Sequence, residues 1–180
     1  RVQWIDITDE LKEGTITPII KYKNGYAWFD LSRPYCELEG DAMGHCGNSA
    51  SYNSDDTVLS YRAVKTSAGT TMARPSLTFI LNPDGYLGEM KGRANEKPKE
   101  KYHDAIVDLL LYKGNISSRD EKEFFVKGIR GGGYLPESNF NINDLNETLK
   151  NKLFSQRPEL MPFSERMATD DNAPSTVDII

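Results

Sequence analysis

The sequence predicts an α+β domain, with a small antiparallel sheet that carries helices on one face and an extended C-terminal tail. Two apolar segments flank Asn24-Gly25, and this dipeptide between such segments indicates a tight hairpin, because the turn needs positive φ angles. A second turn, Asn82–Gly85, separates two further strand-like segments. Apolar residues then recur at helical spacing between Tyr102 and Leu110. We therefore expect one domain over residues 1–154 and a tail over residues 155–180.

The first third of the chain is predicted to be mainly β structure. Val2–Ile7 alternates apolar and polar residues, and Thr17–Tyr22 and Tyr26–Leu31 form the two arms of the first hairpin. Ser32–Met43 is predicted to form a short helix, because Ser is a favoured N-cap and Pro follows within the first turn. Gly47–Asp56 is rich in Gly, Ser, Asn and Asp and is expected to be a loop.

The middle of the chain has the clearest pattern. Thr57–Val64, Ser76–Leu81 and Tyr86–Lys91 are predicted to be three strands of a meander. A helix is expected over Pro98–Tyr112, because Pro is favoured in a first helical turn, and Gly114 ends it.

The C-terminal part of the chain is predicted to hold one strand, one helix and the tail. Phe124–Ile129 resembles a strand, and Asn143–Phe154 has the pattern of a second helix. Ser155–Ile180 contains three prolines and little periodicity, but its apolar residues are clustered. A purely solvated tail would not need such residues, so we expect the tail to contact other protein chains of an assembly. The alternative is that it folds back onto the domain.

Composition excludes several classes of protein. The 180 residues include 22 Lys and Arg against 27 Asp and Glu, a net charge of −5, so coating of nucleic acid by bulk charge is not expected. No apolar run is longer than Leu109–Tyr112, which is much shorter than the roughly 18 residues of a membrane-spanning helix. Two cysteines are too few for a disulfide-rich scaffold and favour a reducing compartment, although one bridge remains sterically conceivable.

The cluster Gly44–Gly47 contains the most reactive side chains. A thiolate at Cys46 is a nucleophile that an imidazole such as His45 can activate, so these two residues are the candidate catalytic pair. The alternative is a buried thiol beside a histidine that caps a helix. Zinc needs four ligands, and the only other nitrogen or sulfur donors of this kind are Cys36 and His103, without a CxxC or HxxxH spacing. Neither a metal nor a cofactor is predicted.

A second candidate chemistry is metal-dependent phosphodiester cleavage. Asp84 and Glu89 are two carboxylates near Lys91, an arrangement that resembles the core of a metal-dependent nuclease. The alternative is a turn followed by an exposed strand. Whether the protein is an enzyme therefore stays open.

Basic residues gather just before the predicted central helix. Lys91, Arg93 and Lys97 are the candidate phosphate contacts in a stretch that also contains three glutamates. The alternative is the solvated start of a helix. Arg130–Gly133 is rich in Gly but lacks the Lys-Ser/Thr pair of a phosphate-binding P-loop.

Several segments in this order resemble the PcfJ-like family of conjugative plasmids and bacteriophages, over roughly residues 22–112. They are Tyr22–Trp28, Leu38–Cys46, Ser60–Arg62 with Ser76–Ile80, and Met90–Pro98. Two features differ from the family pattern: Gly47 directly follows Cys46, and the acidic position of the family's T-I-E strand is apolar in Thr78–Leu81. The resemblance implies a setting in the bacterial host cytoplasm or a virion, and it implies no particular reaction.

The predicted meander would bring several of these side chains together. We expect one shared site from His45, Cys46, Arg62, Thr78, Lys91 and Asn95. The expected function is that of a phage or mobile-element domain without catalysis, either a processed virion component or a protein- or DNA-interaction module. A start at Arg1 rather than Met fits a cleaved precursor or a shortened chain. The alternatives are a Cys–His enzyme and a metal-dependent, nuclease-like domain.

Overall fold

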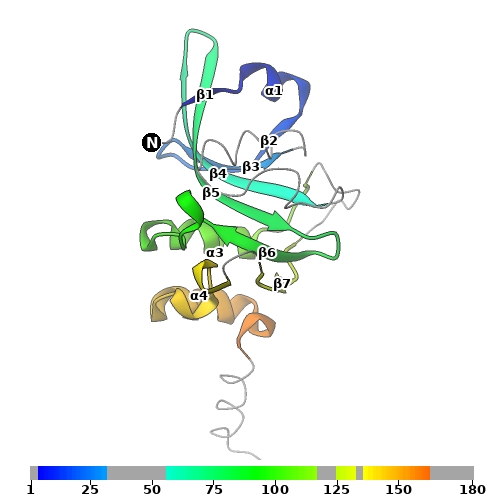
Figure 1. The fold of residues 1–180 in the computed structure, drawn as a ribbon, viewed down its shortest axis with the longest axis vertical. Helices are drawn as coiled ribbons and strands as arrows, with labels where there is room; N and C mark the ends of the chain where they lie inside the picture. The colour runs from blue at the N-terminus through cyan, green and yellow to red at the C-terminus, as the bar shows by residue number, and fades with distance from the viewer. Residues whose placement is uncertain (1–3, 32–55, 117–124, 133–135, 163–180) are drawn as a thin grey trace, which may run out of the picture.

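A computed structural model describes residues 4–31, 56–116, 125–132 and 136–162 as one curled sheet with α-helices packed against it (Figure 1). The strands are β1 (Ile5–Asp6), β2 (Ile16–Lys21), β3 (Tyr26–Leu31), β4 (Thr57–Ser67), β5 (Thr70–Leu81), β6 (Tyr86–Lys91) and β7 (Gly128–Ile129). The α-helices of the described residues are α1 (Thr8–Glu13), α3 (His103–Leu111) and α4 (Glu147–Gln156). The α+β class predicted from the sequence is confirmed.

The sheet is a meander from β2 to β6, to which β1 and β7 are added as short strands. Its order is β2-β3-β4-β5-β6-β7, and β1 pairs with β5 outside this path. Every pair is antiparallel except β6 with β7, which run parallel, so the sheet is mixed and not purely antiparallel. Of the strand predicted over Phe124–Ile129, only the two residues of β7 are in a strand. The predicted order of the three middle strands, now β4, β5 and β6, is confirmed.

Both turns predicted from the sequence close hairpins. Gly25 has a φ of 87°, and the Tyr22 N–H donates to the Tyr26 carbonyl at 2.9 Å. Gly85 has a φ of 95°, and its N–H donates to the Asn82 carbonyl at 2.9 Å. A residue with a Cβ is disfavoured at such angles, so these glycines determine where the chain reverses.

The β4–β5 hairpin is longer than its pattern predicts. The two strands stay paired out to Ser67 and Thr70 around a turn at Ala68 and Gly69, where both φ angles are positive. Residues 65–70 are exposed on both faces of this arm. Without a buried face there is no apolar alternation to reveal a strand.

Two helices begin elsewhere than expected, and one was not predicted. α3 begins at His103 instead of Pro98, because residues 96–99 are extended or irregular and Glu100–Tyr102 form a 3-10 turn. α4 begins after Asn146, whose side-chain oxygen accepts from the Leu149 N–H at 2.9 Å, as expected of an N-cap. α1 has only six residues, too few to show a helical period.

Each face of the sheet has its own core. On one face, α3 and α4 cover a cluster that includes Trp28, Phe79 and Ile106, all fully buried. The opposite face carries a smaller cluster around Phe29 and Val58, against which Leu11 of α1 packs. The predicted placement of helices on one face therefore holds for α3 and α4, whereas α1 belongs to the other face.

The predicted tail begins too early. Arg157 and Leu160 are 5% and 8% exposed, and α4 continues to Gln156, so residues 155–162 are part of the folded domain. The Arg157 side chain is buried because it donates hydrogen bonds to backbone carbonyls in the core. The spacing of apolar residues in the sequence does not indicate such a contact. The rest of the predicted tail lies outside the described residues.

Asn139 takes the place of a strand partner beside β6. Its Oδ1 accepts from the Met90 N–H at 2.6 Å, and its Nδ2 donates to the Gly88 carbonyl at 2.9 Å. These bonds lie at the irregularity in β6 where the pairing with β5 shifts register. The side chain is 5% exposed, so it satisfies two backbone groups that water does not reach.

We therefore expect Asn139→Asp to lower the free energy of unfolding by about 2–3 kcal/mol. The carboxylate can accept from Met90, but it cannot donate to Gly88 and leaves that buried carbonyl unsatisfied. Chemical denaturation monitored by circular dichroism measures the change. The matched control is Asn143→Asp at an exposed position of the same segment, which should change the stability little. Equal effects of the two substitutions would contradict this role for Asn139.

Candidate anion-binding pocket

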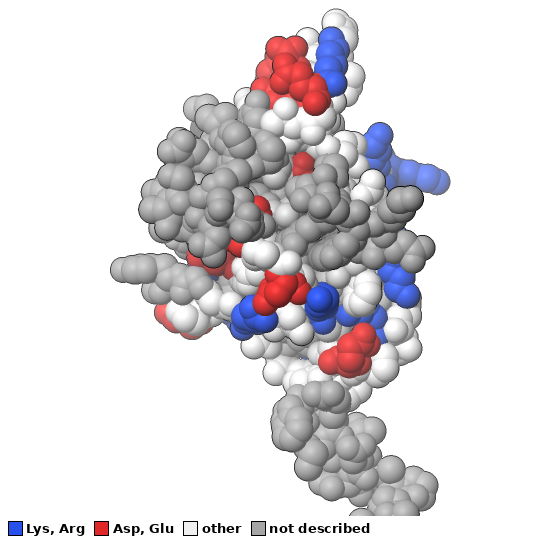
Figure 2. Space-filling model, turned by 90° about the vertical axis from the view of Figure 1, so that its right-hand side faces the viewer, with Lys and Arg blue, Asp and Glu red and all other residues white. Residues whose placement is uncertain are grey.

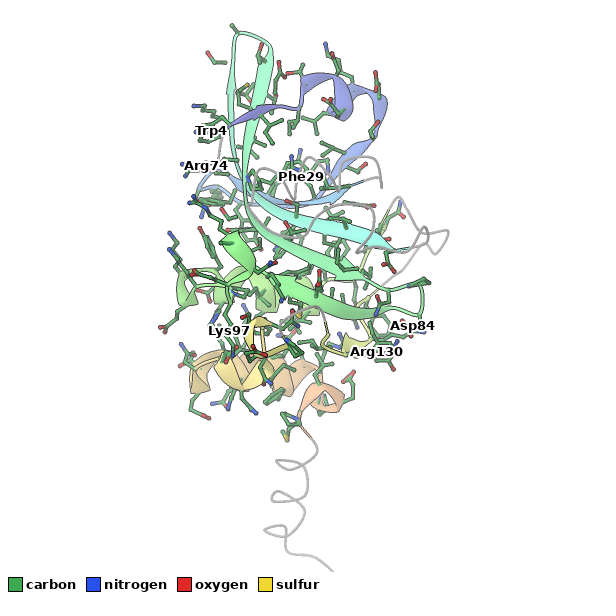
Figure 3. The ribbon with its side chains drawn as sticks, in the orientation of Figure 1. Trp4, Phe29, Arg74, Asp84, Lys97 and Arg130 are labelled. Atoms are coloured by element: carbon green, nitrogen blue, oxygen red, sulfur yellow. The ribbon has the colours of Figure 1, made fainter. Side chains whose placement is uncertain are left out.

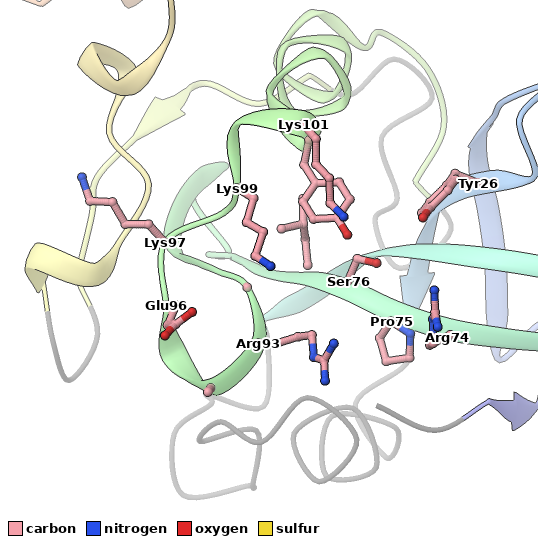
Figure 4. A pocket seen from close by; sticks show the side chains of 13 residues that line it. Tyr26, Arg74, Pro75, Ser76, Arg93, Glu96, Lys97, Lys99 and Lys101 are labelled. Carbon is pink, nitrogen blue, oxygen red and sulfur yellow. The ribbon is translucent and has the colours of Figure 1, made fainter. Parts of the chain in front are cut away.

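A cavity of about 360 Å³ opens between the sheet and the segment that leads into α3 (Figure 4). Residues of β3 and β5 form one wall of the cavity, and residues of the segment 92–102 form the opposite wall. The lining residues are Tyr26, Arg74, Pro75, Ser76, Leu77, Gly92, Arg93, Ala94, Glu96, Lys97, Lys99, Lys101 and Tyr102.

Strand register builds the sheet side of the pocket. Ala63 on β4 pairs with Tyr26 on β3 and with Arg74 on β5. Directly paired residues point to the same face of a sheet, so Tyr26 and Arg74 flank Ala63 on one face. The next pair along β4 and β5 is Arg62 with Pro75, and the register shifts between Tyr61 and Arg62. Pro75 and Ser76, which lie at this irregularity, also line the pocket.

A tight loop builds the other side. Ala94 and Asn95 both have positive φ angles, 56° and 61°, and the Gly92 N–H donates to the Glu96 carbonyl at 2.8 Å. The loop thereby turns the chain back and brings Arg93 and Lys99 to the same cavity (Figure 4).

The pocket carries a strong local excess of positive charge. Five basic residues line it, Arg74, Arg93, Lys97, Lys99 and Lys101, against one acidic residue, Glu96. All five are exposed. Within the described part of the chain, no carboxylate forms an ion pair with any of them except Lys97.

Lys97 differs from the other four cations. Its Nζ lies 2.9 and 3.1 Å from the two carboxylate oxygens of Asp144, and in Figure 4 its side chain extends away from the cavity. Its charge is therefore largely compensated. The cations that stay available for an anion are the other four, Arg74, Arg93, Lys99 and Lys101.

Aromatic rings form the base of the pocket. Tyr26 stacks on Tyr61 with ring centroids 5.1 Å apart and an interplanar angle of 15°, and Tyr61 contacts Tyr102 edge-on at 5.7 Å. Burial, reinforced by the neighbouring Tyr26, raises the pKa of Tyr61 to about 12. A tyrosine is already neutral near pH 7, and this shift keeps the Tyr61 ring neutral to still higher pH.

A second tyrosine ties this base to α3. The Tyr22 hydroxyl donates to Asp108 Oδ2 at 2.8 Å, and burial together with this carboxylate raises the pKa of Tyr22. The bond joins the β2–β3 hairpin to α3, the helix into which the pocket wall of residues 92–102 leads.

This arrangement suits binding of phosphate or another oxyanion. Guanidinium and ammonium groups form charge-assisted hydrogen bonds to phosphate oxygens, and Arg does so with two parallel donors. The pocket lining contains no histidine or cysteine and a single carboxylate. Among the described residues, no group of three or more His, Cys, Asp or Glu could hold a metal ion.

The three predicted phosphate contacts have different surroundings. Arg93 lines the pocket, Lys97 lines it but pairs with Asp144, and Lys91 does not line it. Lys91 is 3% exposed and pairs across the sheet with Thr78. Strand alternation accounts for the difference, because Lys91 is the last residue of β6 and points into a face, whereas Arg93 follows in the loop.

The sequence alone does not single out Arg74, Lys99 or Lys101 as anion contacts. The two lysines belong to the basic stretch before α3, so their spacing is a signal that could include them. Arg74 is a solitary cation in its segment, and only the pairing of β5 with β4 places it beside the others.

Part of the predicted shared site does come together. Thr78 on β5 pairs directly with Ser60 on β4 and with Lys91 on β6, and Arg62 Nε donates to Ser60 Oγ at 3.1 Å. Arg62, Thr78 and Lys91 thus share the sheet face opposite α3, and each is nearly buried. Asn95 lies in the loop at the pocket wall. His45 and Cys46 lie outside the described residues, as does the predicted helix Ser32–Met43.

The nuclease-like residues are not gathered by the fold into a cluster of acids. Asp84 lies in the exposed β5–β6 turn and forms an ion pair with Arg130 (Figure 3). Glu89 is half-buried within β6. The Asp84 carboxylate is therefore paired with a cation at the surface.

Comparison with known proteins adds no family. No protein-family model, no curated protein and no solved structure matches this chain. The resemblance to the PcfJ-like family stays a prediction. None of the helices described is long and apolar enough to cross a bilayer.

Proposed function

We propose that this protein is an interaction module that binds the phosphate backbone of a nucleic acid through the pocket of Figure 4. The observation that carries the proposal is a set of four cations, Arg74, Arg93, Lys99 and Lys101, which face one cavity and have no paired carboxylate among the described residues. Phosphate contacts of this kind supply most of the affinity in nucleic-acid binding.

The charge distribution supports a local site over binding by overall charge. The chain has a net charge of −5, and on the face drawn in Figure 2 basic and acidic residues lie interspersed. Positive charge concentrated in one concave region can still attract an anion against an acidic background, because salt screens the more distant carboxylates.

The proposal agrees with the binding role expected from the sequence. A phage or mobile-element protein in the host cytoplasm or a virion would encounter nucleic acid directly. The protein partner expected for the C-terminal tail is a separate hypothesis, which now concerns the residues beyond 162. The Cys–His chemistry of His45 and Cys46 is another, and both groups of residues lie outside the described ranges.

We expect Arg93→Glu to weaken binding of a fluorescein-labelled oligonucleotide about ten-fold or more in about 50 mM salt. The substitution removes one charge-assisted contact and adds a repulsive carboxylate, together about 1.5–3 kcal/mol. Fluorescence anisotropy measures the affinity. With about four contacts, the logarithm of the association constant should fall with the logarithm of salt concentration at a slope of about −3 for a single strand and about −4 for a duplex.

The matched control is Lys113→Glu, which makes the same charge change at an exposed position beyond the C-terminal end of α3. It should retain nearly the affinity of the unmodified protein. Equal loss in both variants would show that overall charge, and not the pocket, attracts the oligonucleotide. Absence of binding by the unmodified protein would refute the proposal.

A further inference from the structure

We infer that the ligand is a single-stranded nucleic acid that runs from the cationic pocket across the end of the sheet to Trp4, where a base stacks. This inference rests on the proposed function, because it identifies which nucleic acid the pocket holds. It follows from a row of side chains that the strand register places on one face.

The row runs from the residue before β1 across β5 and β4 to β3. β1 pairs with β5 through Ile5 with Ala73, so the residue before Ile5, Trp4, comes opposite Arg74. Arg74 in turn pairs with Ala63 on β4, and Ala63 pairs with Tyr26 on β3. An aromatic ring, a cation, a small residue and a second aromatic ring therefore follow one another across the sheet.

Two cations that could bind a phosphate lie next to the ring of Trp4. Lys65 Nζ lies 4.0 Å and Arg74 Cζ lies 5.2 Å from the centroid of its ring. Figure 3 shows Trp4 and Arg74 beside each other at the edge of the molecule. Both basic side chains are exposed and Trp4 is half-buried. The side chain of Lys65 is flexible, so its ammonium group can move off the indole ring. A base can then stack on the ring while the ammonium group contacts the adjoining phosphate.

The spacing of the row suits an extended strand of nucleotides. Neighbouring strands lie about 4.8 Å apart, so Trp4 and Tyr26 are separated by about 14 Å. About four steps of the ~3.4 Å rise that one strand has in duplex DNA cover this distance, and an extended single strand needs fewer. Arg74 lies between the two rings and also lines the pocket, so one continuous chain can contact all three.

The aromatic residues distinguish a single strand from other polyanions. A base stacks on a protein ring only when it is free of its own neighbours, as in single strands, whereas a duplex keeps its bases stacked inside. A sulfated polysaccharide or an acidic peptide would use the cations and leave Trp4 without a role.

The intrinsic fluorescence of the protein tests this directly. The chain has two tryptophans, and Trp28 is 0% exposed with its indole N–H bonded to the Ala105 carbonyl at 2.9 Å. Quenching by a stacked base therefore reports on Trp4. Titration with a dT20 oligonucleotide should quench the emission, whereas heparin should bind without comparable quenching.

Affinity measurements by anisotropy complete the test, with dT20 and a duplex of the same length. We expect Trp4→Leu to weaken dT20 binding about five-fold or more, to leave duplex and heparin binding within about two-fold, and Trp4→Phe to restore most of the loss. The melting temperature of each variant identifies any unfolding.

The outcomes separate the two proposals. Equal affinity for duplex and dT20, or dT20 binding without quenching and without loss in Trp4→Leu, would overturn the single-strand inference while the pocket proposal stands. Absence of binding to all three polyanions would overturn the proposed function itself.

Discussion

Trp28→Ala is expected to lower the free energy of unfolding by about 4 kcal/mol, because it empties the centre of the larger core. The Trp28 side chain is 0% exposed between the sheet and α3, and it packs against Phe79 and Tyr61 with ring centroids 5.2 and 5.1 Å away. Truncation removes this contact area and leaves a large cavity, which costs about 3–5 kcal/mol for Trp or Phe. It also leaves the Ala105 carbonyl without its donor.

Denaturation by urea, followed by far-ultraviolet circular dichroism, measures this change. For a domain of this size, about 4 kcal/mol corresponds to a fall in melting temperature of roughly 8–16 °C. Trp28→Phe is the informative second variant, because it keeps most of the apolar contact but loses the hydrogen bond and some volume. Its free energy of unfolding should lie between those of Trp28→Ala and the unmodified protein. A Trp28→Phe variant as unstable as Trp28→Ala would show that the ring contacts contribute little.

Arg157→Leu is expected to destabilise the domain by about 3 kcal/mol. Arg157 is 5% exposed, and its Nη1 donates to the carbonyl of Leu110 at 2.8 Å and to the carbonyl of Val126. Leu110 lies in the last turn of α3, whose terminal carbonyls have no partner within the helix. Hydrogen bonds from a charged donor contribute about 1.5–3 kcal/mol each, and leucine supplies neither of them.

The matched control is Arg130→Leu, because Arg130 is about half exposed and pairs with Asp84 at the surface. Exposed ion pairs typically contribute about 1 kcal/mol or less, so this variant should stay close to the unmodified protein. Arg157→Lys should be intermediate, since a single ammonium group does not reproduce the planar fork of the guanidinium. If Arg157→Leu were as stable as Arg130→Leu, residues 155–162 would not belong to the cooperative unit, and the predicted tail from residue 155 would be restored.

The same two residues connect the core of the fold to the pocket. Trp28 joins β3 to α3 through its indole N–H, and β3 begins with Tyr26 at one wall of the pocket. Lys99–Tyr102, at the other wall, lead directly into α3. Arg157 holds the far end of the same helix. Loosening of either contact should therefore weaken anion binding as well as stability.

Elements with a local cause can be predicted from the amino-acid sequence alone. The turns at Gly25 and Gly85 require backbone angles that glycine tolerates, and β3 and β6 have the bounds that their apolar patterns predict, Tyr26–Leu31 and Tyr86–Lys91. The apolar face of α3 was likewise visible in the spacing of its residues, although its first turn was not. In each case the physical cause lies within a few neighbouring residues.

Which side chains lie next to one another depends on the three-dimensional fold. Arg74 joins the cationic pocket through its pairing with Ala63, Lys91 leaves it because it lies buried on a sheet face, and Lys97 is compensated by Asp144, 47 residues further along the chain. Arg157 looks like a solvated charge in the sequence, yet it is buried where two backbone carbonyls accept hydrogen bonds from its Nη1. Register and long-range hydrogen bonds fix these positions, and both depend on pairings between segments that no local pattern records.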